Sequence, residues 1–110
     1  MNQSELNTFK RKHFDLSKRI IEGAIIHDPG TTPEHRKLVE SVCGWAHKNK
    51  YAYFTRSYLK EGKIVDVVVP GLIRPFIEVR ASEEKKTKEY LDKYEDMIQF
   101  IDVSDPYHLL

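Results

Sequence analysis

The residues KIVDVVV at positions 63–69 and FIEVR at positions 76–80 decide how we expect this chain to fold. Both stretches are short and rich in β-branched residues, as is typical of buried strands. Each also carries one acid, Asp66 in the first and Glu78 in the second. A carboxylate in an apolar strand is costly to bury without a cation or hydrogen-bond donors. Two such acids on neighbouring strands therefore indicate a metal site.

The segments on either side of residues 63–69 predict a sheet of three antiparallel strands. Residues 51–59 are aromatic and β-prone, and KEGK at positions 60–63 supplies a hairpin turn into the next strand. Pro70-Gly71 is a second turn signal, which leads towards the strand at residues 76–80. The simplest arrangement of these elements is a three-stranded meander.

A helix and one further strand are expected after the meander. Ser82 can cap a helix that runs to about Met97, because apolar residues recur there at helical spacing. The residues QFIDV at positions 99–103 are short and β-branched, which favours a strand. A helix that connects two strands of one sheet usually makes them parallel neighbours, so we expect this last strand to be parallel to its neighbour.

Two helices are expected before the meander. Ser4 is the expected cap of an amphipathic first helix that ends near Gly23. The prolines and glycine in residues 25–33 favour a connection, and a second helix follows over Pro33–Lys48. The predicted order is helix, helix, three strands, helix, strand. This order gives an α/β fold in which helices flank a small mixed sheet.

Length and charge limit the classes of protein to which the chain can belong. Its 110 residues suit a single domain, 1–110, with an N-terminal segment at 1–26 appended to a core at 33–103. Lys and Arg total 18 against 17 Asp and Glu, so any surface that binds nucleic acid must be local. No stretch approaches the ~20 apolar residues of a membrane span, and the N-terminus lacks the apolar segment of a signal peptide. We therefore expect no membrane partner.

The histidines and the cysteine are expected to have structural roles. His13, His27, His35 and His47 do not show the paired spacing of a zinc-binding helix. Cys43 is the single cysteine, which excludes an intramolecular disulfide and a cysteine-rich zinc site and suits a reducing cytoplasm. It lies on the apolar stripe of the second helix, where a thiol is usually a small buried hydrophobe.

Strand geometry brings the two acids together. Side chains alternate between the faces of a strand, so Glu78 and Arg80 share a face and Asp66 can lie beside Glu78 across the meander. Neighbouring carboxylates repel unless a cation or a proton joins them, and Mg²⁺ or Mn²⁺ is the common solution. Such an ion can hold a water and polarise a phosphate. A second interpretation stays open, in which the acids lie on a solvated face and Glu78 forms an ordinary ion pair with Arg80.

With these acids, the order of elements over residues 33–103 resembles the PD-(D/E)xK nuclease superfamily. The stretch from Phe76 to Ser82 looks most like the Glu-Val-Lys stretch of archaeal Holliday junction resolvases and of related small nucleases from archaea and their viruses. The resemblance implies a restriction-endonuclease-like core and Mg²⁺- or Mn²⁺-dependent cleavage of DNA, including structured or branched DNA. The site that it implies has two metal-binding carboxylates, one backbone carbonyl ligand and one helical acid, at Asp66, Glu78, Val79 and Glu40 respectively.

Arg80 departs from the pattern, because that family usually has a lysine at this position. Arginine stays protonated, so Arg80 could stabilise phosphate charge but could not serve easily as a base. Lys85, Lys86 or Lys88 of the following helix could supply the missing role, although each could equally be a solvated helix-face charge.

Contacts with nucleic acid are expected from Arg56 and Lys60, beside the aromatic strand, and from Lys85 and Lys86. Core packing of that strand is the other interpretation. The basic residues of the first helix could dock on a phosphate backbone, or its apolar face could join two subunits. A homodimer would suit an enzyme that cuts two strands.

Two alternatives without cleavage stay open. A nuclease-like domain that has lost its lysine could bind nucleic acid or a protein partner without cutting. A winged-helix protein is also compatible with two N-terminal helices before a β-hairpin, but it does not explain a helix and a strand after Arg80.

Overall fold

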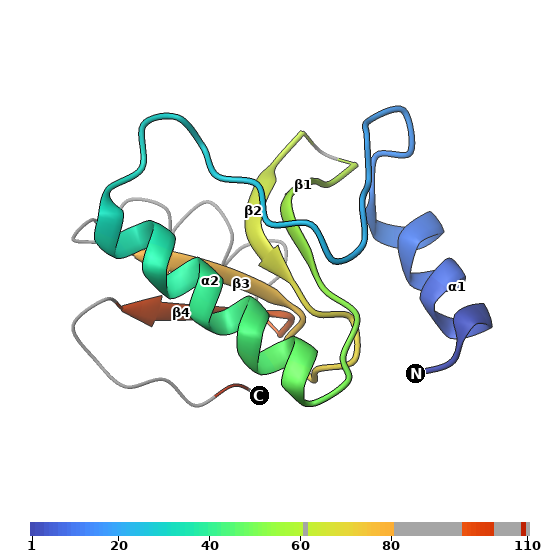
Figure 1. The fold of residues 1–110 in the computed structure, drawn as a ribbon. Coiled ribbons are helices and arrows are strands. Elements are labelled where there is room, and N and C mark those ends of the chain that lie inside the picture. Colours follow the sequence, from blue (N-terminus) through green and yellow to red (C-terminus); the bar gives the residue numbers. More distant parts are fainter. Residues whose placement is uncertain (61, 81–95, 103–108, 110) are drawn as a thin grey trace.

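A computed structural model describes residues 1–60, 62–80, 96–102 and 109 of the chain. Within these residues two helices are followed by four strands (Figure 1). The helices and strands are α1 (Gln3–His13), α2 (Pro33–Lys48), β1 (Phe54–Tyr58), β2 (Ile64–Val68), β3 (Phe76–Arg80) and β4 (Ile98–Asp102).

The four strands form one mixed sheet in the order β1-β2-β3-β4. Strand β2 pairs antiparallel with β1, and β3 pairs antiparallel with β2, so the predicted meander is confirmed. Strand β4 pairs parallel with β3 over its whole length, as predicted for the strand at 99–103. The winged-helix alternative does not account for this parallel strand. The small α/β fold with a mixed sheet is thus established.

The expected order of elements differs from the observed one between β3 and β4. The predicted helix from Ser82 to about Met97 lies almost entirely outside the described residues. Its last two positions, Asp96 and Met97, form a turn, and β4 begins at once at Ile98. The N–H of Phe76 donates to the carbonyl oxygen of Met97 (3.0 Å), which starts the parallel pairing there.

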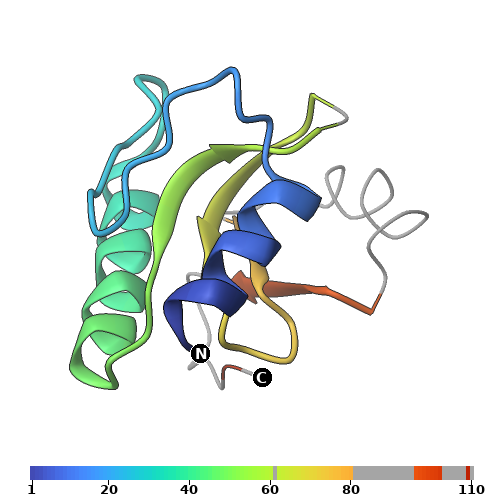
Figure 2. The same ribbon diagram turned by 90° about the vertical axis from the view of Figure 1, so that its right-hand side faces the viewer.

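The two helices cover opposite faces of the sheet (Figure 2). On the α1 side, Leu6 packs in a buried cluster with aromatic and aliphatic side chains of the strands, among them Phe54, Val68 and Phe76. On the α2 side, Val39, Val42, Cys43 and Ala46 pack against a second cluster from β2, β3 and β4. Both faces are therefore buried, which explains why the strands read as nearly continuous apolar runs.

Helix α2 has the bounds that the sequence predicts. The side chain of Thr32 accepts a hydrogen bond from the N–H of His35 (3.2 Å), and Pro33 takes the first helical position. Helical spacing then directs Val39, Val42 and Cys43 to the sheet. The helix ends at Lys48, before Asn49.

Helix α1 is shorter than predicted. Its cap is Asn2 and not Ser4, since the Asn2 side chain accepts from the N–H of Glu5 (2.8 Å) in a capping box. The helix ends at His13, well before Gly23, because Phe14 leaves the helix to enter the core, where it is fully buried and forms a β-bridge with Leu59.

The segment between the helices, residues 14–32, runs along the outer side of β1. The N–H of Gly23 donates to the carbonyl oxygen of Tyr53 (2.9 Å), with Gly23 at a φ of +79° that favours glycine. The N–H of Ile26 donates to the Thr55 hydroxyl (2.8 Å). The segment thereby covers part of the outer edge of β1, an edge that would otherwise invite pairing with another chain.

The apolar face of α1 is not available for a homodimer, because it packs on the sheet through Leu6 and Phe9. A dimer would need another surface. Among the described residues, no helix is long and apolar enough to cross a membrane.

Candidate functional site

Asp66 and Glu78, called here the acidic pair, meet where the regular pairing of β2 with β3 ends. The last paired residues are Val67 and Ile77, and the acidic pair follows at the next position of each strand. There the N–H of Asp66 donates to Glu78 Oε1 (3.1 Å). The N–H of Val79 donates to Asp66 Oδ2 (2.9 Å). Each carboxylate thus accepts a backbone hydrogen bond from the strand opposite, and the two acids lie at neighbouring positions of adjacent strands. Joint binding of a metal by the two carboxylates stays a prediction.

Burial makes this arrangement unusual for two acids. Glu78 is fully buried, and the side chain of Asp66 is only 10% exposed. Hydrogen bonds from backbone N–H groups to a carboxylate are stronger than neutral ones and offset part of the cost of burial. The interpretation of the acids as a solvated sheet face is therefore wrong. Solvent reaches the pair on the Asp66 side.

His35 joins the acidic pair from the first turn of α2. Its Nε2 lies 3.5 Å from Asp66 Oδ2, which is longer than a normal hydrogen bond. Its Nδ1 is buried and has no hydrogen-bond partner within the described part of the chain. The sequence reasoning missed this residue. The signal was the helical spacing of His35 with Val39 and Val42, which puts all three on the side that faces the sheet.

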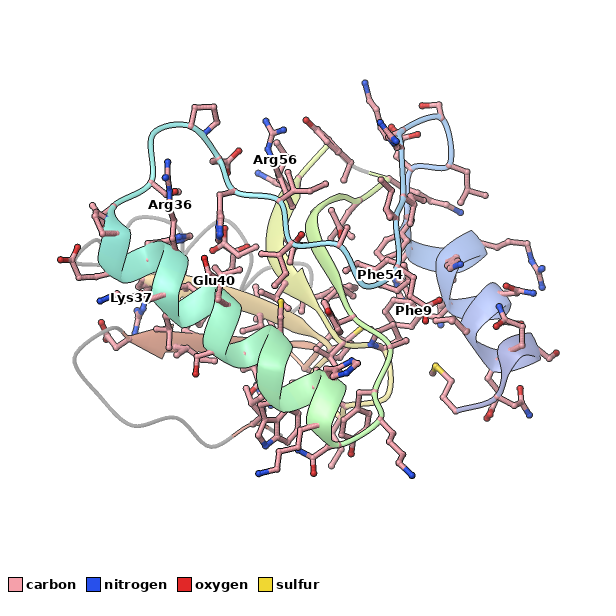
Figure 3. The ribbon with its side chains drawn as sticks, viewed as in Figure 1. Phe9, Arg36, Lys37, Glu40, Phe54 and Arg56 are labelled. Carbon is pink, nitrogen blue, oxygen red and sulfur yellow. The ribbon has the colours of Figure 1, made fainter. Side chains whose placement is uncertain are left out.

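Glu40, the helical acid that the family resemblance implied, lies elsewhere on α2 (Figure 3). Its side chain is 55% exposed, and its Oε2 lies 3.0 Å from Nε2 of His27 in the connecting segment. Glu40 comes five positions after His35, so helical geometry turns it away from the sheet. The structure brings His35, and not Glu40, to the acidic pair.

Arg80 is held at the end of β3 by two contacts from β4. Its Nη2 lies 3.5 Å from Asp102 Oδ2, and its guanidinium carbon lies 5.0 Å from the centre of the Phe100 ring. Parallel pairing explains both contacts, because Arg80 is in register with Asp102. The side chain stays 21% exposed. Arg80 thus pairs with Asp102 of β4, and an ion pair of Arg80 with Glu78 stays a prediction.

Val79, the predicted backbone ligand, is placed beside the acidic pair. Its N–H binds Asp66, while its side chain is buried against α2. Coordination of a metal by its carbonyl oxygen stays a prediction.

The predicted nucleic-acid contacts separate into two groups. Arg56 and Lys60 lie on β1 and just after it, while Lys85 and Lys86 lie outside the described residues. The guanidinium of Arg56 is ion-paired with Asp28, and Lys60 is exposed.

Within the described ranges, no three His, Cys, Asp or Glu side chains converge as a ready-made metal site. This finding bears mainly on metals such as zinc, which take three or four protein ligands. Mg²⁺ is bound by one or two carboxylates and keeps several waters, so the acidic pair is chemically sufficient for it.

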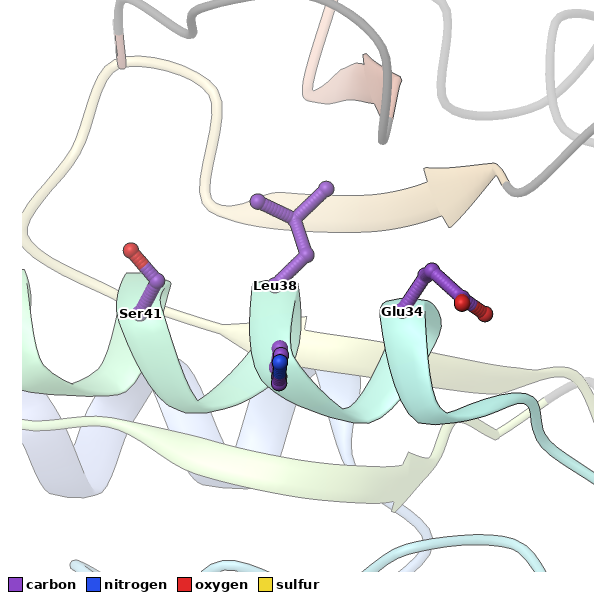
Figure 4. A pocket seen from close by; sticks show the side chains of 4 residues that line it. Glu34, Leu38 and Ser41 are labelled. Atoms are coloured by element: carbon purple, nitrogen blue, oxygen red, sulfur yellow. The ribbon is translucent and has the colours of Figure 1, made fainter.

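One pocket of the molecule lies away from the acidic pair. It has a volume of about 320 Å³ and is lined along α2 by Glu34, Lys37, Leu38 and Ser41 (Figure 4). Neither acid of the pair lines it. Its walls offer no pair of carboxylates, so it is a weaker candidate for metal chemistry.

Comparisons with known proteins found no relative of this chain. No protein-family model, curated protein or solved structure matches the chain. The chemistry must accordingly be argued from the residues themselves.

Proposed function

We propose that this chain is a metal-dependent phosphodiester hydrolase that acts on DNA, with the acidic pair as its Mg²⁺ or Mn²⁺ site. One observation carries the proposal. Two carboxylates on neighbouring strands are buried, and each accepts a hydrogen bond from a backbone N–H of the other strand. Two carboxylates buried on neighbouring strands repel each other when both are charged, and a divalent cation removes this repulsion.

The donor set suits a hard, hydrated cation. It consists of carboxylate oxygens, which Mg²⁺ and Mn²⁺ prefer, and the backbone bonds hold the carboxylates in place before any metal arrives. When bound, such an ion polarises a phosphate and lowers the pKa of a coordinated water. Asp66 is the acid with access to solvent and would face the substrate side.

Two neighbouring residues would support this site. His35 lies against Asp66 from α2 and limits the positions that its carboxylate can take. Arg80 carries a permanent positive charge on the strand of Glu78 and would stabilise the charge that develops on the phosphate. Its contacts with Asp102 and Phe100 fix where that charge sits.

A restriction-endonuclease-like core is part of the same proposal. It is supported by an acid on the second strand, Glu-Val-Arg on the third, and a parallel fourth strand. Helix α2 lies over this sheet, but it contributes His35 in place of the expected Glu40.

The test is cleavage of single-stranded, nicked and branched DNA in Mg²⁺ or Mn²⁺, together with direct measurement of Mn²⁺ binding by electron paramagnetic resonance. We expect Asp66→Asn and Glu78→Gln each to abolish cleavage. Each should also weaken Mn²⁺ binding by at least the roughly 10- to 100-fold that loss of a ligand's hydrogen-bond partner costs. Glu34→Gln, which removes an exposed acid of α2, is the matched control. Absence of cleavage with every DNA form, or equal Mn²⁺ binding by all three variants, would refute the proposal.

A DNA-binding domain that does not cut is the second candidate, and the Arg80–Asp102 ion pair favours it. This pair neutralises part of the charge that cleavage would use. Under this alternative the wild type binds Mn²⁺ and DNA but cuts nothing. Arg80→Lys then separates the candidates, because a gain of cleavage in that variant would identify a lost catalytic lysine.

A further inference from the structure

The end of α1, the loop after it and the β1–β2 hairpin bring many cations together at one end of the molecule. The N–H of Lys60 donates to the carbonyl oxygen of His13 (3.1 Å), and the N–H of Asp15 donates to that of Tyr58 (2.9 Å). Segments far apart in the sequence thus lie side by side (Figures 1 and 2). The exposed or partly exposed cations of these segments are Lys10, Arg11, Lys12, Lys18, Arg19, Arg56 and Lys60.

Tyr58 organises the centre of this region. Lys18 Nζ lies 5.6 Å from the centre of its ring, and the guanidinium carbon of Arg56 lies 6.0 Å from it. A cation over an aromatic ring is held by the ring's electron-rich face. Lys18, Arg56, Tyr58 and Lys60 are called here the basic surface.

Acids of the described residues offset part of the charge of the basic surface. Among the described residues, Arg56 has an ion pair with Asp28, whereas Lys18 and Lys60 have none. The Asp15 carboxylate accepts hydrogen bonds from the hydroxyl (2.6 Å) and the N–H (3.0 Å) of Ser17. These bonds, and secondarily the charge of Lys18, lower the pKa of the Asp15 carboxyl. The chain has a net charge of +1, so positive charge gathered at one end is a local feature. Such exposed charge suits an anionic partner and adds little to the stability of the fold.

The basic surface lies one strand away from the acidic pair. Thr55 pairs with Val67 and Ser57 with Val65, so Arg56 lies opposite Asp66 across β1 and β2. Arg56 has a φ of +43°, which is rare for a residue other than glycine, and its ion pair with Asp28 helps to hold it there (Figure 3). From the hairpin, β2 reaches Asp66 two residues after Ile64, about 7 Å along the strand.

We infer that the basic surface docks the phosphate backbone of DNA and leads one strand towards the acidic pair. The direction of this path rests on the proposed function, whereas the docking itself does not. Lys18 and Lys60 supply the charges that contact phosphates, and Tyr58 positions Lys18 and Arg56. The N-terminal segment therefore has a role in binding, beyond covering the edge of β1.

The test compares two double variants that remove the same charge. Lys18→Gln/Lys60→Gln removes the basic surface's lysines, and Lys37→Gln/Lys48→Gln removes two exposed lysines of α2. Binding of fluorescein-labelled single-stranded and duplex DNA is measured by anisotropy over a range of salt, with EDTA present so that no cleavage occurs. We expect the first variant to lose affinity on the order of tenfold. Its plot of log K against log[salt] should become less steep by about 1.4 on single strands and about 1.8 on duplex DNA.

Three outcomes would overturn the inference. The first is an equal loss of DNA affinity in both double variants. The second is an unchanged slope of log K against log[salt] for Lys18→Gln/Lys60→Gln. The third is binding to an anionic lipid vesicle or an acidic peptide but not to DNA. If the wild type binds DNA through the basic surface but cuts no DNA in the presence of metal, the proposed function alone is refuted. If the wild type cuts DNA and Lys18→Gln/Lys60→Gln binds DNA as the wild type does, this inference alone is refuted.

Discussion

The acidic pair and the basic surface hold opposite charges in opposite environments. Asp66 and Glu78 are buried and bound by backbone N–H groups of neighbouring strands. Lys18 and Lys60 are exposed; Lys18 lies over the Tyr58 ring, and the N–H of Lys60 donates to the carbonyl oxygen of His13. A buried charge is coupled to folding, while an exposed one is coupled mainly to partners. Substitutions that remove a buried hydrogen-bonding group in the first region should therefore change stability and function together, and those in the second should change binding alone.

The largest effect is expected at Cys43, in the buried layer between α2 and the sheet. Burial, and secondarily the charge of Glu40, raises the pKa of the Cys43 thiol to about 12. At pH 8 the folded protein should then react with a disulfide reagent about a thousandfold more slowly than the unfolded chain, because only the thiolate reacts. Stopped-flow labelling with and without denaturant measures this ratio.

Stability should follow the same shift. The folded pKa lies above the unfolded value of 9.0, so Cys43 favours folding below about pH 9 and loses that contribution as the pH rises towards 12. Rapid labelling of Cys43 in the native protein at pH 8 would show that the layer between α2 and the sheet is open to solvent. The contrast between this buried layer and the exposed basic surface would then be lost.

The next effect is expected at Glu78. Glu78→Ala leaves the N–H of Asp66 without its acceptor and opens a cavity, so the free energy of unfolding should fall by about 2–4 kcal/mol. Glu78→Gln keeps an acceptor oxygen and nearly the same volume, so it should change stability by less than about 1 kcal/mol. Urea unfolding followed by fluorescence of Trp45 measures both. Equal destabilisation by the two variants would mean that the charge itself supports the fold.

A smaller effect is expected at His35. His35→Ala removes a mostly buried ring from the contact between α2 and Asp66, which should lower the free energy of unfolding by about 1–2 kcal/mol. The matched variant is His47→Ala, an exposed residue of the same helix, whose stability should match the wild type. A larger fall in the free energy of unfolding for His47→Ala than for His35→Ala would contradict the assignment of His35 to the buried region.

The smallest effect on stability is expected for the basic surface. Lys18→Gln/Lys60→Gln should shift the melting temperature by less than about 2 °C, because exposed charges add little to folding. Scanning calorimetry at low and high salt checks this. A large shift would show that these lysines stabilise the packing of the hairpin on α1, and binding would no longer be their separate role.

The sheet and α2 were predictable because local rules and tertiary packing agree there. The β-branched runs around Asp66 and Glu78 could be placed on two buried faces, and Thr32-Pro33 marks the start of α2. The end of α1 could not be found in this way. Residues after His13 keep a helical pattern, but burying Phe14 beside Leu59 outweighs the few hydrogen bonds of a longer helix.

The site was predictable in its acids and not in its neighbours. Glu40 and His35 lie on one helix, and a sequence pattern permits either to face the sheet until the phase of the helix is known. Arg80 likewise shares a strand face with Glu78, and the parallel pairing of β3 with β4 also brings it to Asp102, on a strand that begins eighteen residues further on.

By itself, the sequence determined the strands, the second helix and the acids that those strands carry, because hydrophobic periodicity and turn residues act over short distances. Only the tertiary structure decided which charges meet. It placed His35 and not Glu40 beside Asp66, paired Arg80 with Asp102, and gathered Lys18, Arg56 and Lys60 around Tyr58 in a chain of nearly balanced charge. The physical reason is that electrostatic contacts depend on distance through space, and a nearly neutral sequence can fold into separate acidic and basic regions.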